Sequence, residues 1–218
     1  MKEKESWDQL HYENRLWDEG YQQIMGLDEV GRGCLAGPVV AAGVILRRED
    51  IPLGITDSKQ IKTHTQRVEI AKLIKEKALY WVVKSCEPSE IDQLNILRAS
   101  LFAMKKCVES NEAQPDFLLI DGNKTIDSLI RQKTIIKGDS KSASIGAASI
   151  LAKVYRDELM FQLHELYPFY SWDKNVGYPT IAHYNGLSTH GITPLHRRSF
   201  NLKTTLEYIS DEAEGSLG

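Results

Sequence analysis

The sequence predicts an α/β protein built on a mixed sheet. Three observations support this fold class: apolar runs of strand length, apolar stripes of helical period, and strands that come first and then alternate with helices. The run from Gly37 to Leu46 is made of small and β-branched apolar residues, which is typical of a strand buried on both faces. A chain of 218 residues can bury a full core, and its length suggests either one large domain or one domain with an appendage.

The first half of the chain supplies most of the predicted sheet. Residues 7–20 carry a few apolar side chains among charges, so we expect a short helix there. Strands are predicted at 21–30, 37–46 and 79–85, and an apolar stripe from Val68 to Ala78 predicts a helix between the last two.

The second half continues the alternation of helices and strands. Ser89 is the expected N-cap of a helix that continues to Val108 with one apolar face. Further elements are predicted from their apolar patterns: strands at 116–123 and 133–137, and a long helix at 142–164. The long helix opens with Ser, Ala and Gly, which allows close backbone packing. From Trp172 onward we expect helices and loops that cap one side.

Composition narrows the class of protein. The net charge of −3 argues against a tail that binds nucleic acid by bulk charge, although a local basic groove remains compatible with it. The cysteines Cys34, Cys86 and Cys107 are odd in number and lack CxxC spacing, so we expect free thiols in a reducing cytoplasm. No apolar run reaches the length of a membrane span, and the charged N-terminus is unlike a secretory signal.

Acidic residues end or follow the predicted strands: Asp28, Glu29, Asp121 and Asp139. Ligands usually bind at the strand ends of an α/β sheet. Hard oxygen ligands favour Mg²⁺ or Mn²⁺, and two such ions roughly 3.5–4 Å apart can activate water and stabilise the leaving oxygen of a phosphodiester. Adjacent strand residues point to opposite faces, so Asp28 and Glu29 share a site only if the strand ends or bulges there. For any single acid, a solvated carboxylate at a loop start is the simpler interpretation.

Basic residues accompany these acids. Lys59, Lys137 and Lys141 fall in the neighbouring loops, and Arg197 and Arg198 lie near the end of the chain. They are candidates for phosphate contacts, and each taken alone fits a charge that keeps the protein soluble.

Other side chains invite competing interpretations. The histidines His183, His190 and His196 can in principle bind zinc, but their spacing favours surface or loop positions. Tyr178 lies between Gly177 and Pro179 and is either a packing aromatic or a platform for a sugar or base. A serine hydrolase is not expected, because no His–Asp pair accompanies the serines near Ser149.

Several motifs together resemble one family. Gly26 to Gly33, followed by Leu-Ala-Gly-Pro-Val-Val-Ala-Ala, resembles the signature of bacterial ribonuclease HII, the type 2 ribonuclease H family. Further family motifs follow in order: Thr56 to Lys59, Leu119 to Asn123, Lys137 to Lys141, Ala147 to Lys153, Asn175 to Thr180 and His196 to Phe200. The likeness extends from about Tyr21 to Phe200, nearly the whole chain.

The resemblance implies a ribonuclease H-like fold, with a five-stranded mixed sheet flanked by helices and a C-terminal helical extension. It implies an endonuclease that uses Mg²⁺ or Mn²⁺, with two ions when substrate is bound. The expected substrates are RNA–DNA hybrids and duplex DNA containing single ribonucleotides. Cleavage is expected on the 5′ side of the ribonucleotide, leaving a 3′-hydroxyl and a 5′-phosphate, as ribonucleotide removal in replication and repair requires.

The resemblance also implies roles for individual residues. The acids that end the strands are the expected catalytic and metal-binding groups: Asp28, Glu29, Asp121 and Asp139. The turn Gly31-Arg32-Gly33 is expected to read the 2′-hydroxyl, the group that separates RNA from DNA, largely through its backbone. Tyr178 is expected to stack on the sugar next to the scissile phosphate, with Lys59 and Lys141 as further substrate contacts.

Two departures from the family pattern are present. Cys34 stands where the family commonly has proline, which alters the stiffness of the turn and removes no catalytic group. The first strand begins about twenty residues into the sequence, which together with Arg32 favours ribonuclease HII over ribonuclease HIII. The expected organisation is a helical extension at 1–20, a catalytic domain at 21–205, and a disordered tail at 206–218 in a cytoplasmic monomer. Rival hypotheses are a DNA-directed nuclease or resolvase of the same superfamily and a hybrid-binding module without catalysis.

Overall fold

The computed structural model describes residues 9–52, 54–55, 63–110 and 114–202. Its described residues form two compact units. The first unit draws on residues 1–30, 40–84 and 101–154, and the second on 31–39, 85–100 and 155–218. The expected disordered tail at 206–218 lies outside the described residues, and the domain boundaries at 20 and 205 stay predictions.

The sheet confirms the predicted fold class. It has five strands in the order β3-β2-β1-β4-β5, with bounds β1 Ile24–Val30, β2 Val39–Ile45, β3 Tyr80–Cys86, β4 Phe117–Asp121 and β5 Arg131–Ile135. Strand β1 pairs antiparallel with β2 and parallel with β4, and β4 pairs parallel with β5, so the sheet is mixed.

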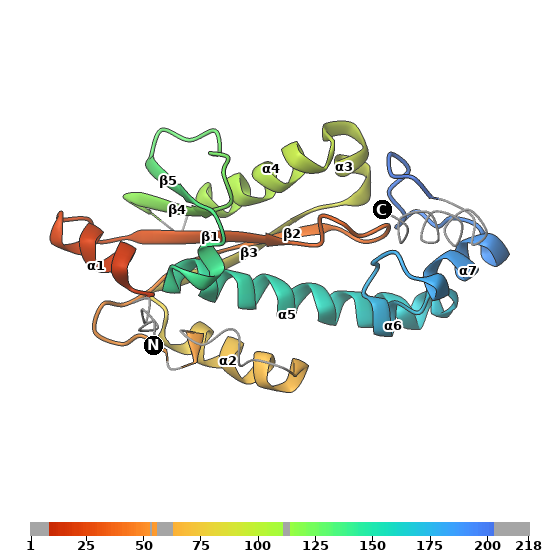
Figure 1. The fold of residues 1–218 in the computed structure, drawn as a ribbon, viewed down its shortest axis with the longest axis horizontal. Helices are drawn as coiled ribbons and strands as arrows, with labels where there is room; N and C mark the ends of the chain where they lie inside the picture. Colours follow the sequence, from red (N-terminus) through yellow and green to blue (C-terminus); the bar gives the residue numbers. More distant parts are fainter. Residues whose placement is uncertain (1–8, 53, 56–62, 111–113, 203–218) are drawn as a thin grey trace, which may run out of the picture. The chain divides into compact units, whose positions relative to one another are not determined.

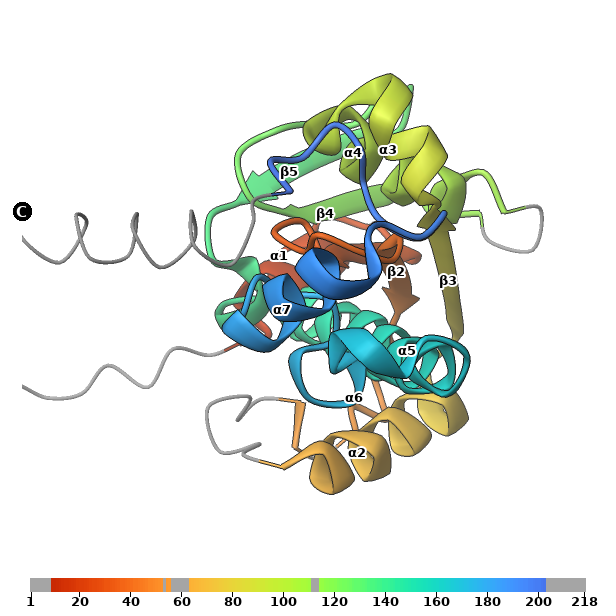
Figure 2. The same cartoon turned by 90° about the vertical axis from the view of Figure 1, so that its right-hand side faces the viewer.

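Helices cover both faces of the sheet within the first unit (Figures 1 and 2). The helices of the chain are α1 His11–Asp18, α2 His64–Lys77, α3 Pro88–Leu94, α4 Ile96–Val108, α5 Ala143–Leu166, α6 Trp172–Asn175 and α7 Ile181–His190, with short 3₁₀ helices η2 Gly138–Ser140 and η3 Pro168–Tyr170. The end of α4 covers one face and the beginning of α5 covers the other, with α2 beside α5. None of the helices within the described residues is long and apolar enough to cross a membrane.

The two faces of the central strands can be assigned from the pairing register. Gly26 pairs with Val44 and Asp28 with Ala42, and paired residues project to the same face. Val44 and Ala42 belong to a buried cluster with side chains of α2 and α5. The alternate residues face α4, where Cys107 Sγ lies 3.5 Å from the carbonyl oxygen of Ala41. Asp28 therefore projects to the face that α5 covers.

Strand β1 and the start of α5 pack closely, as the small residues of that helix predict. A Cβ added to Gly26 would lie 2.2 Å from the carbonyl carbon of Ser144. Such a contact is far inside van der Waals distance, so only glycine fits at position 26 without moving the helix. This approach brings the first turns of α5 onto the strand that carries Asp28.

One predicted helix is two helices. The expected single helix up to Val108 breaks at Asn95, whose φ of 66° lies in the left-handed region. The Asn95 side chain accepts a hydrogen bond from the backbone N–H of Arg98, so it caps the beginning of α4. The predicted N-cap Ser89 was also wrong: Glu87 caps α3 and forms a capping box with Glu90.

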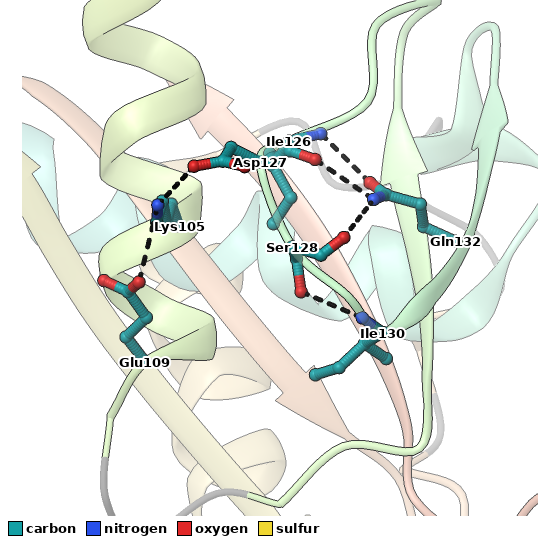
Figure 3. A network of polar contacts seen from close by, with 7 residues as sticks. All are labelled: Lys105, Glu109, Ile126, Asp127, Ser128, Ile130 and Gln132. Carbon is teal, nitrogen blue, oxygen red and sulfur yellow. Dashed lines mark hydrogen bonds and ion pairs between the residues drawn. The ribbon is translucent and has the colours of Figure 1, made fainter.

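The connection between β4 and β5 is ordered by side chains (Figure 3). Gln132 accepts from the backbone N–H of Ile126 and donates to its carbonyl oxygen. Lys105 of α4 contacts both Asp127, at 2.6 Å, and Glu109, at 3.6 Å. These contacts fix a loop that returns the chain to β5, which begins at Arg131 and ends at Ile135, two residues before the predicted strand at each end.

Helix α1 is joined to the start of α5 by a buried carboxylate. Glu13 is 1% exposed and accepts hydrogen bonds from the hydroxyls of Ser142 and Ser144 and from the backbone N–H of Ser144. Burial raises the pKa of Glu13, while these hydrogen bonds oppose the shift. The carboxylate satisfies donors at the N-terminus of a helix, where negative charge is favourable.

We expect Glu13→Ala to lower the free energy of unfolding by about 2–4 kcal/mol, because it leaves buried donors of Ser142 and Ser144 without an acceptor. Urea denaturation at neutral pH measures the loss. The matched control is Glu19→Ala, which removes only the exposed Arg15–Glu19 pair and should cost no more than about 0.5 kcal/mol. Equal effects from the two variants would contradict a structural role for Glu13.

The second unit has an aromatic core. Trp172 is fully buried and stacks on Tyr170 with ring centroids 5.0 Å apart. Tyr184 and Leu187 of α7 and Met160 of α5 join the same buried cluster. Helices α6 and α7 confirm the prediction that the chain from Trp172 onward contains helices, and this cluster packs them against α5 within the second unit.

Candidate active site

Asp28 and Asp121 directly follow the last residue pair that joins the neighbouring strands β1 and β4. The parallel register pairs Leu27 with Ile120, so its next step sets Asp28 beside Asp121 on the same face of the sheet. Burial raises the pKa of Asp28 well above its ordinary value, and the negative charges of Asp121 and Glu29 add to the rise. The first unit therefore holds a buried carboxylate among other carboxylates.

Asp139 joins this pair through the turn that follows β5. Asp121 Oδ1 accepts a hydrogen bond of 2.6 Å from the backbone N–H of Gly138. Burial raises the pKa of Asp121, and the charge of Asp139 contributes to the rise. A Cβ on Gly138 would lie 2.7 Å from Ile145 Cδ1 and 3.2 Å from Asp121 Oδ1. The glycine thus lets the turn that carries Asp139 approach Asp121.

Glu29 follows Asp28 in β1 without a bulge between them. The β1–β2 ladder runs in register from Met25 to Val30, so there is no bulge at Glu29, and the strand ends one residue later. Regular alternation sends the Cβ atoms of Asp28 and Glu29 to opposite faces. Glu29 is half-buried, and its backbone N–H donates to Asp28 Oδ1 at 2.7 Å. The charge of its carboxylate nevertheless contributes to the raised pKa of Asp28.

The chemistry of these groups fits a divalent cation. Within the described parts of the chain, no three His, Cys, Asp or Glu side chains are arranged to hold a metal ion. Yet a buried carboxyl group whose pKa is raised by neighbouring carboxylates, as that of Asp28 is, is costly to ionise without a positive charge beside it. Oxygen donors of this kind are the ligands that Mg²⁺ and Mn²⁺ prefer. Asp28 and Asp121 would be the first residues to hold such an ion.

Sequence reasoning missed Ser149. Its hydroxyl forms a hydrogen bond with the Asp28 carboxylate and lowers the pKa of that group, against the larger effect of burial. Ser149 lies on α5, one turn or more beyond Ser144, on the helix that packs against β1. The sequence feature that could have identified Ser149 was the face of small residues on α5, because small side chains let a helix lie close to a strand.

The turn Gly31-Arg32-Gly33 belongs to the second unit and is held by a buried arginine. Arg197 is fully buried, and its guanidinium donates to the carbonyl oxygens of Gly31, Arg32 and Gly37 at 2.7–3.0 Å. The first two of these carbonyls therefore point toward Arg197. In a trans peptide the N–H points opposite to the C=O, so the N–H groups of Arg32 and Gly33 point away from Arg197.

A second buried arginine holds the rest of the same loop. Arg156 of α5 is fully buried and donates to the carbonyl oxygens of Ala36, Pro38 and Val176 at 2.7–3.1 Å. Gly31 has a φ of 91°, and a Cβ at this position would lie 2.2 Å from Arg156 Nε. The phosphate contact considered for Arg197 is replaced by this backbone role, and burial lowers the pKa of Arg197 to about 10.

Tyr178 lies close to the turn within the second unit. A Cβ on Gly33 would lie 3.7 Å from the Tyr178 ring, and the backbone N–H of Leu35 donates to the carbonyl of Gly177 at 2.8 Å. Tyr178 is 38% exposed. Burial raises the pKa of its hydroxyl, and the neighbouring Cys34 thiol adds to the rise.

The backbone before Tyr178 is strained. Val176 has a φ of 42°, a left-handed conformation that costs a β-branched residue about 1–3 kcal/mol. Asn175 stabilises it by donating to the carbonyl of Tyr170 and accepting from the N–H of Gly177. Backbone strain that several hydrogen bonds maintain is typical of a functional site. Here the strained residue Val176 fixes the direction in which the Tyr178 side chain projects from the backbone.

The remaining candidates have mixed outcomes. Lys141 Nζ donates to the carbonyl oxygen of Ile136 at 2.8 Å, and Lys59 lies outside the described residues. The cysteines Cys34, Cys86 and Cys107 are free and buried, as expected. The expectation of surface or loop histidines was wrong for His183, which is a buried residue of α7. His196 lies in a loop, as expected, but is only 1% exposed, and His190 is exposed.

Comparison with known proteins now defines the family. The family model described as Ribonuclease HII matches residues 25–203. A ribonuclease HII of Salinibacter ruber is 49% identical over 197 residues, covering 88% of this chain and 98% of that protein. One from Bacteroides thetaiotaomicron is 52% identical over 180 residues, covering 81% of this chain and 88% of that protein.

Solved structures share the fold. Ribonuclease H2 from Pyrococcus horikoshii has a TM-score of 0.70 and 24% identity, over 87% of this chain and 98% of that one. Bst-RNase HIII in complex with Mn²⁺ has a TM-score of 0.61 and 22% identity, over 88% of this chain and 71% of that one. At these identities the likeness concerns the fold, and the family rests on the sequence matches. The chain therefore belongs to the ribonuclease HII family and is a type 2 ribonuclease H, a hydrolase.

Proposed function

We propose that this chain is an endonuclease that uses a divalent metal ion to hydrolyse the RNA strand of RNA–DNA hybrids. We further propose that it cleaves duplex DNA on the 5′ side of a single embedded ribonucleotide and leaves a 3′-hydroxyl and a 5′-phosphate. The observation that carries the proposal is the carboxylate pair Asp28 and Asp121, which directly follows the last residue pair that joins the parallel strands β1 and β4. Membership of the ribonuclease HII family supports the same substrate class.

Four carboxylates are proposed to hold one or two Mg²⁺ or Mn²⁺ ions: Asp28, Glu29, Asp121 and Asp139. A metal ion bound here would lower the pKa of a coordinated water and neutralise charge on the phosphate. The chain's own residues prepare the site: Ser149 orients Asp28, and the Gly138 backbone orients Asp121. The Mn²⁺ complex of Bst-RNase HIII, a protein of the same fold, supports divalent metal use.

Recognition of the ribose is proposed to come from the second unit. Arg197 binds the carbonyl oxygens of Gly31 and Arg32, so the N–H groups of Arg32 and Gly33 point away from Arg197 and are the proposed donors for a 2′-hydroxyl. Tyr178, near Gly33, would stack on the adjoining sugar. Lys141 and Lys59 are proposed phosphate contacts. Backbone donors suit this task because their direction is fixed by the loop and does not depend on a flexible side chain.

The protein is proposed to act as a monomer on nucleic acid. One structural neighbour is described as a PCNA:RNase HII complex from Archaeoglobus fulgidus, with a TM-score of 0.71 and 24% identity over 84% of this chain and 96% of that one. PCNA is therefore a partner of that protein. Size-exclusion chromatography with light scattering tests the monomer proposal for this chain.

The decisive assay uses three labelled duplexes: plain DNA, DNA with one ribonucleotide, and a long RNA–DNA hybrid. Each is incubated with Mg²⁺, with Mn²⁺ and with EDTA. The proposed function predicts metal-dependent cleavage of the last two and none of the first. Cutting of plain DNA would support a resolvase, and binding without cleavage would support a hybrid-binding module.

We expect Asp121→Asn to lower kcat by about a thousandfold or more, because one neutralised carboxylate weakens the cation site that the reaction needs. The matched control is Asp127→Asn. Asp127 is an exposed acid in the connection that follows β4, and it forms an ion pair with Lys105. That variant should keep its activity. Full activity in Asp121→Asn would remove this residue from the site.

In the same assay, Tyr178→Ala should impair cleavage at a single ribonucleotide more than cleavage of the long hybrid.

A further inference from the structure

Two buried histidines connect the end of the described chain to Tyr178. His183 Nδ1 lies 3.0 Å from the carbonyl oxygen of Tyr178, and His183 Nε2 lies 3.1 Å from His196 Nε2. At the far end, His196 Nδ1 accepts from the backbone N–H of Thr193 at 2.9 Å. The indole N–H of Trp172 also donates to His183 Nε2, at 3.2 Å. All of these residues belong to the second unit.

The partners at the two ends determine both tautomers. The Thr193 N–H is a donor, so His196 Nδ1 is bare and His196 carries its hydrogen on Nε2. The Trp172 N–H is also a donor, so His183 Nε2 is bare and accepts from both Trp172 and His196. His183 then carries its hydrogen on Nδ1, where the Tyr178 carbonyl needs a donor. Every other neutral assignment sets two donors or two acceptors against each other.

We propose that His183 and His196 are positioning residues for ribonucleotide recognition. Their hydrogen-bond chain fixes the Tyr178 backbone, while Arg197, the next residue after His196, fixes the Gly31-Arg32-Gly33 turn. The inference rests on the proposed function, because it assigns Tyr178 to the sugar of the substrate. The dipeptide His196-Arg197 thereby fixes the position of Tyr178 relative to the Gly31-Arg32-Gly33 turn. Neither histidine touches the substrate.

Two backbone contacts and the surrounding aromatic rings support this role. His196 forms an isolated β-bridge with Ala36, and the Arg197 N–H donates to the Leu35 carbonyl at 2.9 Å. The loop that follows the turn is thus bonded to the same dipeptide. Tyr170 and Trp172 provide the aromatic surroundings of the pair, with ring centroids 4.8–6.0 Å from those of the histidines. Burial lowers the pKa of both histidines to about 4, so the pair is neutral at the pH of the cell.

The first test reads the tautomers directly. Long-range ¹H–¹⁵N correlation spectra of the full-length protein at neutral pH should show His183 with its hydrogen on Nδ1 and His196 with its hydrogen on Nε2. Exchange of the His183 tautomer to Nε2–H would overturn the proposal, because the Tyr178 carbonyl would then face a bare nitrogen.

The second test compares two variants at one position. In His183→Asn the amide nitrogen occupies the place of Nδ1 and keeps a donor for the Tyr178 carbonyl, whereas His183→Leu removes it. The readout is kcat/KM on duplex DNA with one ribonucleotide, divided by kcat/KM on a long hybrid. We expect His183→Leu to lower this ratio about fivefold, the effect of one hydrogen bond, and His183→Asn to keep most of it.

The ratio separates positioning from general damage, because partial unfolding lowers both numerator and denominator equally. An unchanged ratio in His183→Leu, or an equal fall in both variants, would overturn the proposal. If the wild-type protein cleaves neither substrate, the proposed function fails and the role in recognition fails with it. The tautomers would then still report whether the histidines hold the Tyr178 backbone.

Discussion

Asp28→Asn should abolish turnover and at the same time stabilise the fold. Asp28 is 6% exposed, and burial and the charges of Asp121 and Glu29 all raise the pKa of its carboxyl group. An amide keeps an acceptor for the Glu29 N–H and removes the buried charge. We expect kcat to fall by about a thousandfold or more, and the free energy of unfolding in EDTA to rise by about 1–2 kcal/mol.

Two measurements check this pair of effects: the single-ribonucleotide cleavage assay and urea denaturation with EDTA present. Added Mn²⁺ should raise the melting temperature of the wild-type protein more than that of the variant, because the variant lacks one ligand. Asp50→Asn is the control, since it alters only an exposed pair with Lys77. A variant that is less stable than wild type in EDTA would contradict the view that Asp28 is costly to bury.

Acid should unfold the protein through His183 and His196. The pKa of each falls from an ordinary 6.5 to about 4 because burial disfavours the charged ring. The unfolded chain therefore binds more protons than the folded one between these values, and stability falls as the pH falls. Between pH 7 and pH 5 we expect a loss of about 2 kcal/mol for each histidine. The stabilisation is fully present above pH 6.5 and is lost as the pH approaches 4.

Urea denaturation at pH 7, 6 and 5 measures this dependence. His183→Asn removes one titrating ring, so its stability should change less steeply with pH than that of the wild type. His190→Gln removes an exposed histidine and should leave the slope nearly unchanged. Comparison of slopes cancels the contribution of buried acids such as Glu13, which has the opposite sign because its pKa is raised. Parallel slopes in all three proteins would rule out the pair as the acid-sensitive element.

Much of the fold follows from local patterns in the sequence. The apolar run before Asp121 and the run from Gly37 to Leu46 became buried strands because such runs can bury both faces only inside a sheet. The candidate acids could be predicted from the sequence because each one ends or follows one of these predicted strands. The break at Asn95 was not, because one left-handed residue interrupts a helix without altering its apolar stripe.

The parts of the candidate site that sequence could not supply depend on contacts between distant residues. Arg156 and Arg197 look like ordinary surface charges in the sequence, yet both are buried against backbone carbonyls of a loop more than a hundred residues away. Burial of His183 and His196 likewise follows from packing against Trp172. The alternation that separates the side chains of Asp28 and Glu29 was expected from the sequence, and the β1–β2 register contains no bulge that would bring them to one face.

The division of labour along the chain has a consequence for how this protein can evolve. The candidate catalytic acids all come from the first unit, whereas the turn and Tyr178 come from the second, and the two sets meet in the sequence at the Val30–Gly31 peptide bond. Under the proposed roles, substitutions in the second unit can change which sugar is accepted without altering the carboxylates of the first unit. A change in substrate selectivity and a loss of hydrolytic activity would therefore arise from different mutations, and selection can act on each of them separately.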